Sequence, residues 1–326
     1  MHVILPFAAS LSEPCQHALA QLDRAEHLNN LRFLLSRLTP DAPIGTDEYA
    51  LSMPHERVMA THLGWQHLAD GCLPWAAWHA RQAGIEVGAR AWGYLTPCHW
   101  LMGRDSLTVI DPDELNLHET DSRTLLETIR PWFEEEGWEL HYLSPTSWLA
   151  SHDSLKDLPT ASLERVIGRN PDVWLPEHPN ARLIKRLQNE VQMLMYQHPL
   201  NDQRIANGQL PVNSFWLSGT GVLPENTPLQ CPQDVHIDDA LRTALLATNM
   251  VDWIAAWERL DATILSEARQ AVTAGASVAL SLCGERLAVT WQAGPAQPTL
   301  GRIGLWFHRW LGRGASPSLA ATLGKL

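Results

Sequence analysis

Residues 180–221 read NARLIKRLQNEVQMLMYQHPLNDQRIANGQLPVNSFWLSGTG, and this stretch carries the clearest structural signals of the chain. Apolar residues recur at helical spacing from Asn180 to Gln197, and Pro199 follows, which predicts an amphipathic helix that ends there. The apolar run Val212–Leu217 then predicts a strand that leads into a glycine turn, Ser218-Gly219-Thr220-Gly221. A helix followed by a strand indicates an α/β protein.

The same alternation extends outward from this stretch in both directions. Strands are expected at His2–Phe7, Ala91–Met102, Ser106–Ile110, Trp138–Leu143 and Trp148–Ser151, and a hairpin at Ser277–Trp291. Helices are expected at Glu13–Leu38 (one or two), from Ser52 onward (a pair), at Thr120–Glu136 and at Asp239–Ala274. The predicted fold class is therefore α/β, with a mixed sheet and flanking helices.

Composition excludes several classes of protein. The 326 residues are 45% hydrophobic and 18% charged, which excludes a disordered chain. The formal net charge of −12 argues against nucleic acid as a partner, because a phosphate backbone would be repelled. No run of about 18 apolar residues is present, and the start MHVILPFAAS lacks a basic segment. We therefore expect a cytoplasmic protein with no membrane partner.

The numbers and spacing of cysteine and tryptophan residues further limit the possible classes of protein. Five cysteines occur without a CxxC pair, which predicts buried free thiols and argues against a disulfide framework or a zinc ribbon. The 15 Trp residues outnumber Phe and Tyr together. Tryptophan brings a large apolar area and one N–H donor, so these residues indicate either an aromatic core or the wall of a cleft. Composition leaves both open.

Candidate ligand-binding residues lie directly after the best helix. Asn201, Asp202 and Arg204 could hold a carboxylate or phosphate, since arginine binds such groups bidentately. The alternative is a helix C-cap and turn in which Arg204 pairs with Asp202. The glycine turn could let the backbone approach an anion, or it could be a plain turn. The candidate ligand-binding set is His198, Asn201, Asp202, Arg204, Asn213, Trp216, Ser218, Gly219, Thr220 and Gly221.

Other motifs point to no further chemistry. Pro224 stands where GxGxxG needs its third glycine, and neither GxSxG nor a P-loop occurs. His62 and His67 are five residues apart and do not stack on one helix face, so no metal site is assigned. Residues 301–314 mix Trp with Arg and glycine. They could form a membrane-surface helix, but a helix that docks on the body of the protein is favoured.

Two blocks carry a resemblance to a known family. Leu158–Asn170 (LPTASLERVIGRN) and the run from Arg186 (RLQNEVQMLMYQHPLNDQR), followed by residues 211–221, resemble the bacterial RpfE-type regulatory protein family. Members of that family are related to archaeal-type cofactor-independent phosphoglycerate mutase, in the alkaline phosphatase superfamily. The segment around His198 and Arg204, with Asn213, is similar to the mutase block that helps hold phosphoglycerate.

The resemblance implies a domain plan. Residues 1–94 with 225–298 would form a discontinuous α/β core, which resembles a degenerate alkaline-phosphatase-like core. Residues 95–224 would form an inserted α/β subdomain similar to the substrate-binding part of the mutase. Residues 299–326 would form a C-terminal segment and tail.

Departures from the mutase pattern shape the expected function. Such a mutase uses two divalent metals held by Asp and His, yet Ala8-Ala9-Ser10 follows the first strand and no Asp-His dipeptide occurs. The resemblance thus implies a cytoplasmic binding or regulatory protein that lost phosphoryl transfer, needs no cofactor and keeps a cleft for a small phosphorylated or carboxylated metabolite. Two alternatives remain: an active mutase or phosphatase that uses Mn or another divalent metal through rearranged ligands, and a Trp-rich module that binds a protein partner.

Overall fold

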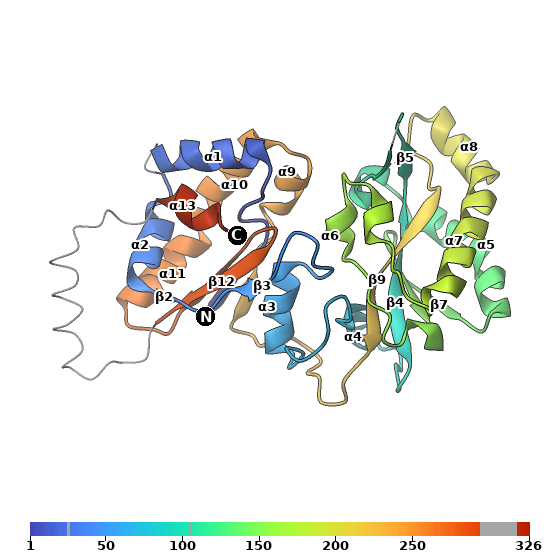
Figure 1. The fold of residues 1–326 in the computed structure, drawn as a ribbon, viewed down its shortest axis with the longest axis horizontal. Coiled ribbons are helices and arrows are strands. Elements are labelled where there is room, and N and C mark those ends of the chain that lie inside the picture. Colours follow the sequence, from blue (N-terminus) through green and yellow to red (C-terminus); the bar gives the residue numbers. More distant parts are fainter. Residues whose placement is uncertain (25–26, 105, 294–317) are drawn as a thin grey trace. The chain divides into compact units, whose positions relative to one another are not determined.

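The computed structural model describes residues 1–24, 27–104, 106–293 and 318–326 (Figure 1). The chain forms two compact units. Unit 1 comprises residues 1–49, 54–59 and 232–326, and unit 2 comprises residues 50–53 and 60–231. The sequence placed the divisions at 94/95 and 224/225, whereas residues 60–94 and 225–231 belong to unit 2. The helix predicted within residues 301–314 lies outside the described residues.

Unit 1 is built on a mixed six-stranded sheet. Its strands are β1 (His2–Leu5), β2 (Thr39–Pro40), β3 (Ile44–Gly45), β10 (Val235–Ile237), β11 (Ala279–Cys283) and β12 (Leu287–Gln292). The order is β10-β1-β11-β12-β2, and β3 also pairs with β12. β1 runs parallel to both of its neighbours, and β12 runs antiparallel to β11. Val3, Ile4 and Leu5 are fully buried, as expected of a central parallel strand covered on both faces.

Helices flank the unit 1 sheet, as the sequence predicted. They are α1 (Glu13–Arg24), α2 (Asn29–Arg37), α9 (Arg242–Leu246), α10 (Met250–Ala262), α11 (Ile264–Thr273) and α13 (Leu319–Leu323), and α3 (Pro54–His62) begins in this unit. The side chain of Asp261 on α10 accepts hydrogen bonds from the backbone N–H groups of Asn30 and Leu31 at 3.2 and 2.8 Å. It thereby satisfies the first N–H groups of α2.

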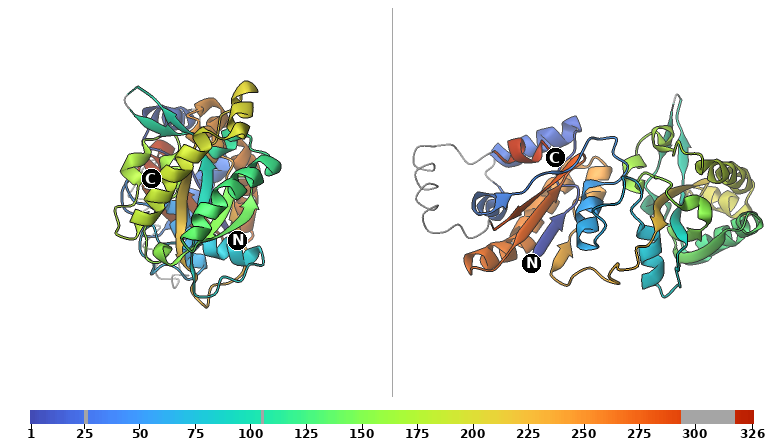
Figure 2. Two further views of the ribbon diagram at one scale, coloured as in Figure 1. Left: turned by 90° about the vertical axis from the view of Figure 1, so that its right-hand side faces the viewer. Right: turned by 60° about the horizontal axis from the view of Figure 1, so that its bottom comes forward.

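Unit 2 contains a four-stranded antiparallel sheet with the order β7-β8-β4-β9. Its strands are β4 (Ala91–Cys98), β7 (Glu139–Ser144), β8 (Ser147–Ser151) and β9 (Ser214–Val222), and β5 (Trp100–Met102) pairs with β6 (Leu107–Val109) in a separate hairpin. The hairpin extends beyond the sheet (Figure 2). The helices are α4 (Trp75–Gln82), α5 (Glu119–Glu135), α6 (Leu163–Val166), α7 (Ala181–Tyr196) and α8 (Pro199–Ala206), with short 3-10 turns η1 (Pro112–Leu115), η2 (Asp153–Leu155) and η3 (Pro171–Trp174).

The core of unit 2 lies on both faces of this sheet. Leu125, Ile129 and Phe133 of α5 and Leu187 and Val191 of α7 pack in one hydrophobic cluster with the sheet, where Figure 1 shows the two helices side by side. A second hydrophobic cluster contains residues of α4 together with the buried side chains of Trp65 and Trp92. Seven Trp side chains are less than 2% exposed: Trp65, Trp92, Trp138, Trp148, Trp216, Trp253 and Trp257. Much of the tryptophan therefore serves the hydrophobic core.

The predicted glycine turn is not a turn. Strand β9 continues through it to Val222, and the register with β4 shifts so that Gly219 and Thr220 lie opposite Gly93. This is a β-bulge, and Gly219 supplies the positive φ of 62° that such a bulge uses. Sequence signals for a turn and for a bulge coincide because both need a residue with φ above zero. The adjoining segment from Pro199 is also regular, as helix α8.

Candidate functional site

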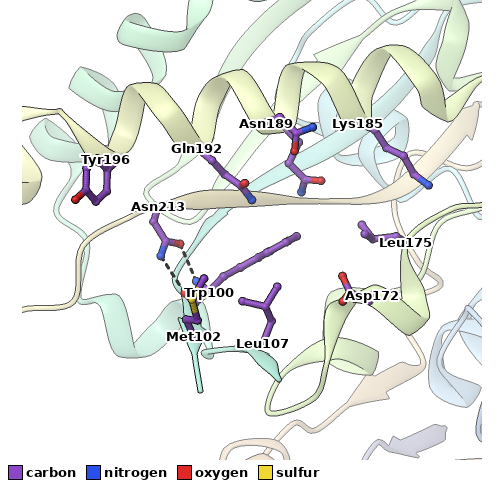
Figure 3. A pocket seen from close by; sticks show the side chains of 11 residues that line it. Trp100, Met102, Leu107, Asp172, Leu175, Lys185, Asn189, Gln192, Tyr196 and Asn213 are labelled. Atoms are coloured by element: carbon purple, nitrogen blue, oxygen red, sulfur yellow. Dashed lines mark hydrogen bonds between the residues drawn. The ribbon is translucent and has the colours of Figure 1, made fainter. Parts of the chain in front are cut away.

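A pocket of about 500 Å³ lies in unit 2 between helix α7, the β5–β6 hairpin and turn η3 (Figure 3). Its lining residues are Trp100, Met102, Leu107, Asp172, Leu175, Lys185, Gln188, Asn189, Gln192, Tyr196 and Asn213. The volume falls within the range of small-molecule sites, which are concave and carry a few convergent polar groups. This pocket is the candidate site.

Helix α7 supplies the polar wall because its sequence has two faces. Lys185, Asn189, Gln192 and Tyr196 are spaced four, three and four residues apart, so they fall on one side of the helix (Figure 3). The apolar residues between them recur at the same period on the other side, where they pack into the core. The amphipathic pattern that predicts the helix therefore also produces one wall of the pocket.

Asn213 and Trp100 form the opposite wall. The Asn213 side chain accepts a hydrogen bond from the backbone N–H of Trp100 at 2.7 Å and donates one to its carbonyl at 3.0 Å (Figure 3). The amide thus pairs with the start of β5 as a neighbouring strand would. The Trp100 indole N–H donates to Cys98 Sγ at 3.1 Å, and the ring extends into the pocket. These bonds fix where the hairpin leaves β4.

Two more amides are tied to strand β9. Gln188 Nε2 donates to the Phe215 carbonyl at 2.7 Å, and Gln192 Nε2 lies 3.2 Å from Ser214 Oγ. β9 is an edge strand of the sheet, so its outer backbone groups need partners, and α7 provides one through Gln188. These contacts hold the helix against the strand along the pocket.

The pocket also carries one positive and one negative side chain. Lys185 is half-buried on α7, and Asp172 is exposed on η3. Within the described residues, neither side chain forms an ion pair. Lys185 is thus a cation beside a concave surface with no carboxylate bound to it.

The structure places Arg204 inside the fold. Its side chain is 1% exposed, Nε donates to the Leu210 carbonyl at 2.9 Å, and Nη2 donates to the Leu115 carbonyl. Nη1 lies 3.7 Å from the carboxylate of Asp121, so the ion pair is with Asp121 and not with Asp202. Burial lowers the pKa of Arg204, and the Asp121 carboxylate acts in the opposite direction. Arg204 therefore clamps the segment that leads to β9.

Asn201 and His198 hold the same connection. The Asn201 side chain is buried, donates to the carbonyls of Met195 and Val212 at 2.7 Å each, and accepts from the Val212 N–H at 2.9 Å. His198 caps α8 by accepting from the Leu200 N–H at 3.2 Å. Asp202 lies on the exposed side of α8.

The remaining predicted residues lie within or beside β9. The buried Trp216 indole donates to the Ala161 carbonyl at 3.0 Å, and its residue borders a cavity of about 20 Å³ that shares Lys185 and Gln188 with the larger pocket. The hydroxyl of Thr220 lies 2.6 Å from the Leu158 carbonyl. Ser218 is buried, and Gly219 and Gly221 have positive φ. Of the ten predicted residues, Asn213 is the one that lines the candidate pocket.

Sequence reasoning missed the polar face of α7. Lys185, Asn189 and Gln192 have the pattern of a solvated helix face, and only the tertiary structure places them with Trp100 around one pocket. One signal was available: the face is rich in amides rather than in charges. Amides are neutral donors and acceptors, which suits a binding surface better than a face selected for solubility alone.

The donor set of a two-metal phosphoryl-transfer site does not fit the described residues. Among them, no three His, Cys, Asp or Glu side chains gather as a metal-binding group. Asp70, three residues after His67, accepts hydrogen bonds from the backbone N–H groups of Leu51 and Ser52 at 2.6 and 3.0 Å. None of the helices in the described ranges has the length and hydrophobicity needed to span a membrane.

Fold and site together define a mixed α/β protein with a pocket in unit 2 that both polar and apolar side chains line. No family model matches the chain, and no curated protein matches it. Among solved structures, it is similar to cofactor-independent phosphoglycerate mutase from Thermoplasma acidophilum DSM 1728, with 13% identity over 89% of each chain and a TM-score of 0.37. It is also similar to the PH0037 protein from Pyrococcus horikoshii, with 11% identity over 91% of this chain and 88% of that one and a TM-score of 0.45.

Proposed function

We propose that this protein binds a small metabolite that carries a phosphate or carboxylate, and that the pocket between α7 and the β5–β6 hairpin is its site. The observation that carries the proposal is Lys185, an ammonium group on the wall of a pocket of about 500 Å³ with no ion-pair partner among the described residues. An anion 4 Å from this group would gain about 1 kcal/mol in bulk water and about 4 kcal/mol in a partly desolvated site.

The net charge of the chain makes Lys185 important for the binding of an anion. The chain has a formal net charge of −12, so an anionic ligand is repelled on average and needs a local cation. Lysine presents its charge as a point on a flexible stem and pairs with either a phosphate or a carboxylate. Asn189 and Asn213 add amide groups that orient the ligand, and the Trp100 ring forms an apolar wall.

The other residues predicted from the sequence take a positioning role in this proposal. Asn201 and Arg204 hold the segment between α8 and β9, and that segment ends at Asn213. Their substitution would alter binding through the fold of unit 2. Direct contact of these two side chains with the ligand stays a prediction from the sequence.

Isothermal titration calorimetry tests the proposal, with 3-phosphoglycerate and inorganic phosphate as probes, each with and without Mn²⁺. We expect at least one of them to bind without metal, and Lys185→Gln to weaken that binding about tenfold, a loss of about 1.4 kcal/mol. Lys156→Gln, at an exposed lysine of the same unit outside the pocket, is the matched control and should leave the affinity unchanged.

The same experiment separates the alternatives. Binding or turnover that needs Mn²⁺ would support a metal-dependent mutase or phosphatase. Equal affinity in Lys185→Gln and wild type would overturn the pocket assignment. The loss of phosphoryl transfer, a regulatory role and a Trp-mediated protein partner stay predictions from the sequence.

A further inference from the structure

The pocket offers a ligand several hydrogen-bond acceptors in addition to the donors of Lys185 and Asn189. Gln188 and Gln192 each use one amide N–H on β9, and their carbonyl oxygens carry no hydrogen bond among the described residues. Asp172 adds a carboxylate, which accepts only. A ligand that satisfies these acceptors must carry N–H or O–H donors of its own.

The pocket combines these acceptors with an aromatic ring and one cation. The Trp100 indole extends between α7 and η3 (Figure 3), so a flat ligand can lie against its face. Base-on-aromatic stacking tolerates any base, because each base has a π face. Lys185 supplies the single positive charge. The site therefore suits a ligand with one anionic group, one planar ring and several donors.

A three-carbon phosphorylated acid fits this arrangement less well. Such a ligand carries two anionic groups, whereas the pocket offers one ammonium, and the second anion would face the Asp172 carboxylate or the amide carbonyls. Like charges or acceptors placed opposite each other are repulsive, and this arrangement disfavours the ligand. Such an acid also has no planar ring that could stack on Trp100.

We propose that the ligand of this pocket is a nucleoside monophosphate whose base carries an exocyclic amino group. This inference rests on the proposed function and names the class of metabolite. The phosphate pairs with Lys185, the base stacks on Trp100, and the exocyclic amine and ribose hydroxyls donate to the glutamine carbonyls and Asp172. A volume of about 500 Å³ accommodates a ligand of this size.

Titration calorimetry of the full chain with AMP, IMP, adenosine, ribose 5-phosphate and 3-phosphoglycerate tests the inference. We expect AMP to bind most tightly. IMP should bind about tenfold more weakly, because a carbonyl replaces the amino group and faces acceptors. Adenosine lacks the anion and ribose 5-phosphate lacks the base, so each should lose about tenfold or more.

A pair of variants isolates the stacking contact. Trp100→Leu should weaken AMP binding about tenfold and leave the binding of ribose 5-phosphate unchanged. Trp132→Leu is the control, at a Trp that is 42% exposed on α5 and does not line the pocket. Trp100→Phe keeps an aromatic face and should retain most of the affinity. The comparison of AMP with IMP uses the wild-type protein and does not depend on how any variant folds.

Each outcome distinguishes the inference from the proposed function. Equal binding of ribose 5-phosphate and AMP would overturn the nucleotide inference and leave an anion-binding pocket. Binding of 3-phosphoglycerate without AMP would do the same. Equal binding of adenosine and AMP would overturn the role of Lys185, and with it the proposed function. Failure of all five ligands to bind would overturn both.

Discussion

Replacing Gly219 by alanine tests whether the segment Ser218–Gly221 is a structural β-bulge or a turn that contacts a ligand. In the structure, Gly219 forms the bulge of β9 with φ of +62°. A Cβ built there would lie 2.8 and 2.9 Å from two ring carbons of Tyr94 and 3.2 Å from Cβ of Trp75. The first two distances are shorter than real Cβ contacts, so the Tyr94 ring or the strand must move.

The cost has two parts. The left-handed conformation costs an L-residue about 1–2 kcal/mol. Crowding in a packed site adds about 1–3 kcal/mol, because Tyr94 is itself hydrogen-bonded to His79 and to the Trp75 carbonyl and cannot turn away freely. We expect Gly219→Ala to lower the free energy of unfolding by about 3 kcal/mol. Gly208→Ala is the control: its φ is +73° with nothing within 4 Å of the added Cβ, so it should cost about 1 kcal/mol.

Urea unfolding, followed by circular dichroism and tryptophan fluorescence, measures both variants against wild type. A difference of about 2 kcal/mol between the two alanine variants supports the packing argument. Equal costs would refute it. If Gly219→Ala kept full stability and lost ligand affinity, the segment would contact the ligand as the sequence suggested, and the structural reading of the bulge would be wrong.

Three further predictions follow from buried polar groups and thiols. Asn201→Ala removes three buried hydrogen bonds and should cost about 3 kcal/mol in urea unfolding; a cost below about 1 kcal/mol would contradict its positioning role. Burial lowers the pKa of His79, so as the pH falls below about 6.5 the unfolded chain binds a proton that the folded protein does not, and the free energy of unfolding decreases. His79→Gln should therefore make the urea midpoint depend less on pH between 7.5 and 5.5. An unchanged pH dependence in this variant would contradict the assigned role of His79. In the native protein a thiol reagent should reach Cys72 and Cys231, which are partly exposed, and should label the other three cysteines only after denaturation; rapid native labelling of all five would refute the burial.

Periodicity predicted the regular elements that pack by local rules. The amphipathic stripe of residues 180–197 became α7, and the continuous apolar run after Met1 became the central strand β1. Both patterns report which side of an element is buried, and burial follows from hydrophobicity alone. The mixed sheet with flanking helices followed from the order of these elements.

Glycine residues predicted the local structure less well than the apolar periodicity did. Gly219 and Gly221 predicted a turn, and the strand passed straight through them, because a glycine with positive φ serves a bulge as well as a turn. Sequence reasoning likewise grouped Arg204 with Asp202. In the structure, the guanidinium contacts the nearby Leu210 carbonyl and two distant groups, the Leu115 carbonyl and the Asp121 carboxylate. No local sequence pattern predicts the two distant partners.

The sequence by itself determined the helices and strands that have a clear apolar period, which of their faces are apolar, and that the chain builds a mixed α/β fold. Those properties depend on neighbours within a few residues. Only the tertiary structure decided that Lys185, Trp100 and Asn213 border one pocket, and that Asn201 and Arg204 lie inside the fold. A polar side chain has the same identity whether it faces solvent, a carbonyl or a cavity. Its role depends on what the rest of the chain places opposite it.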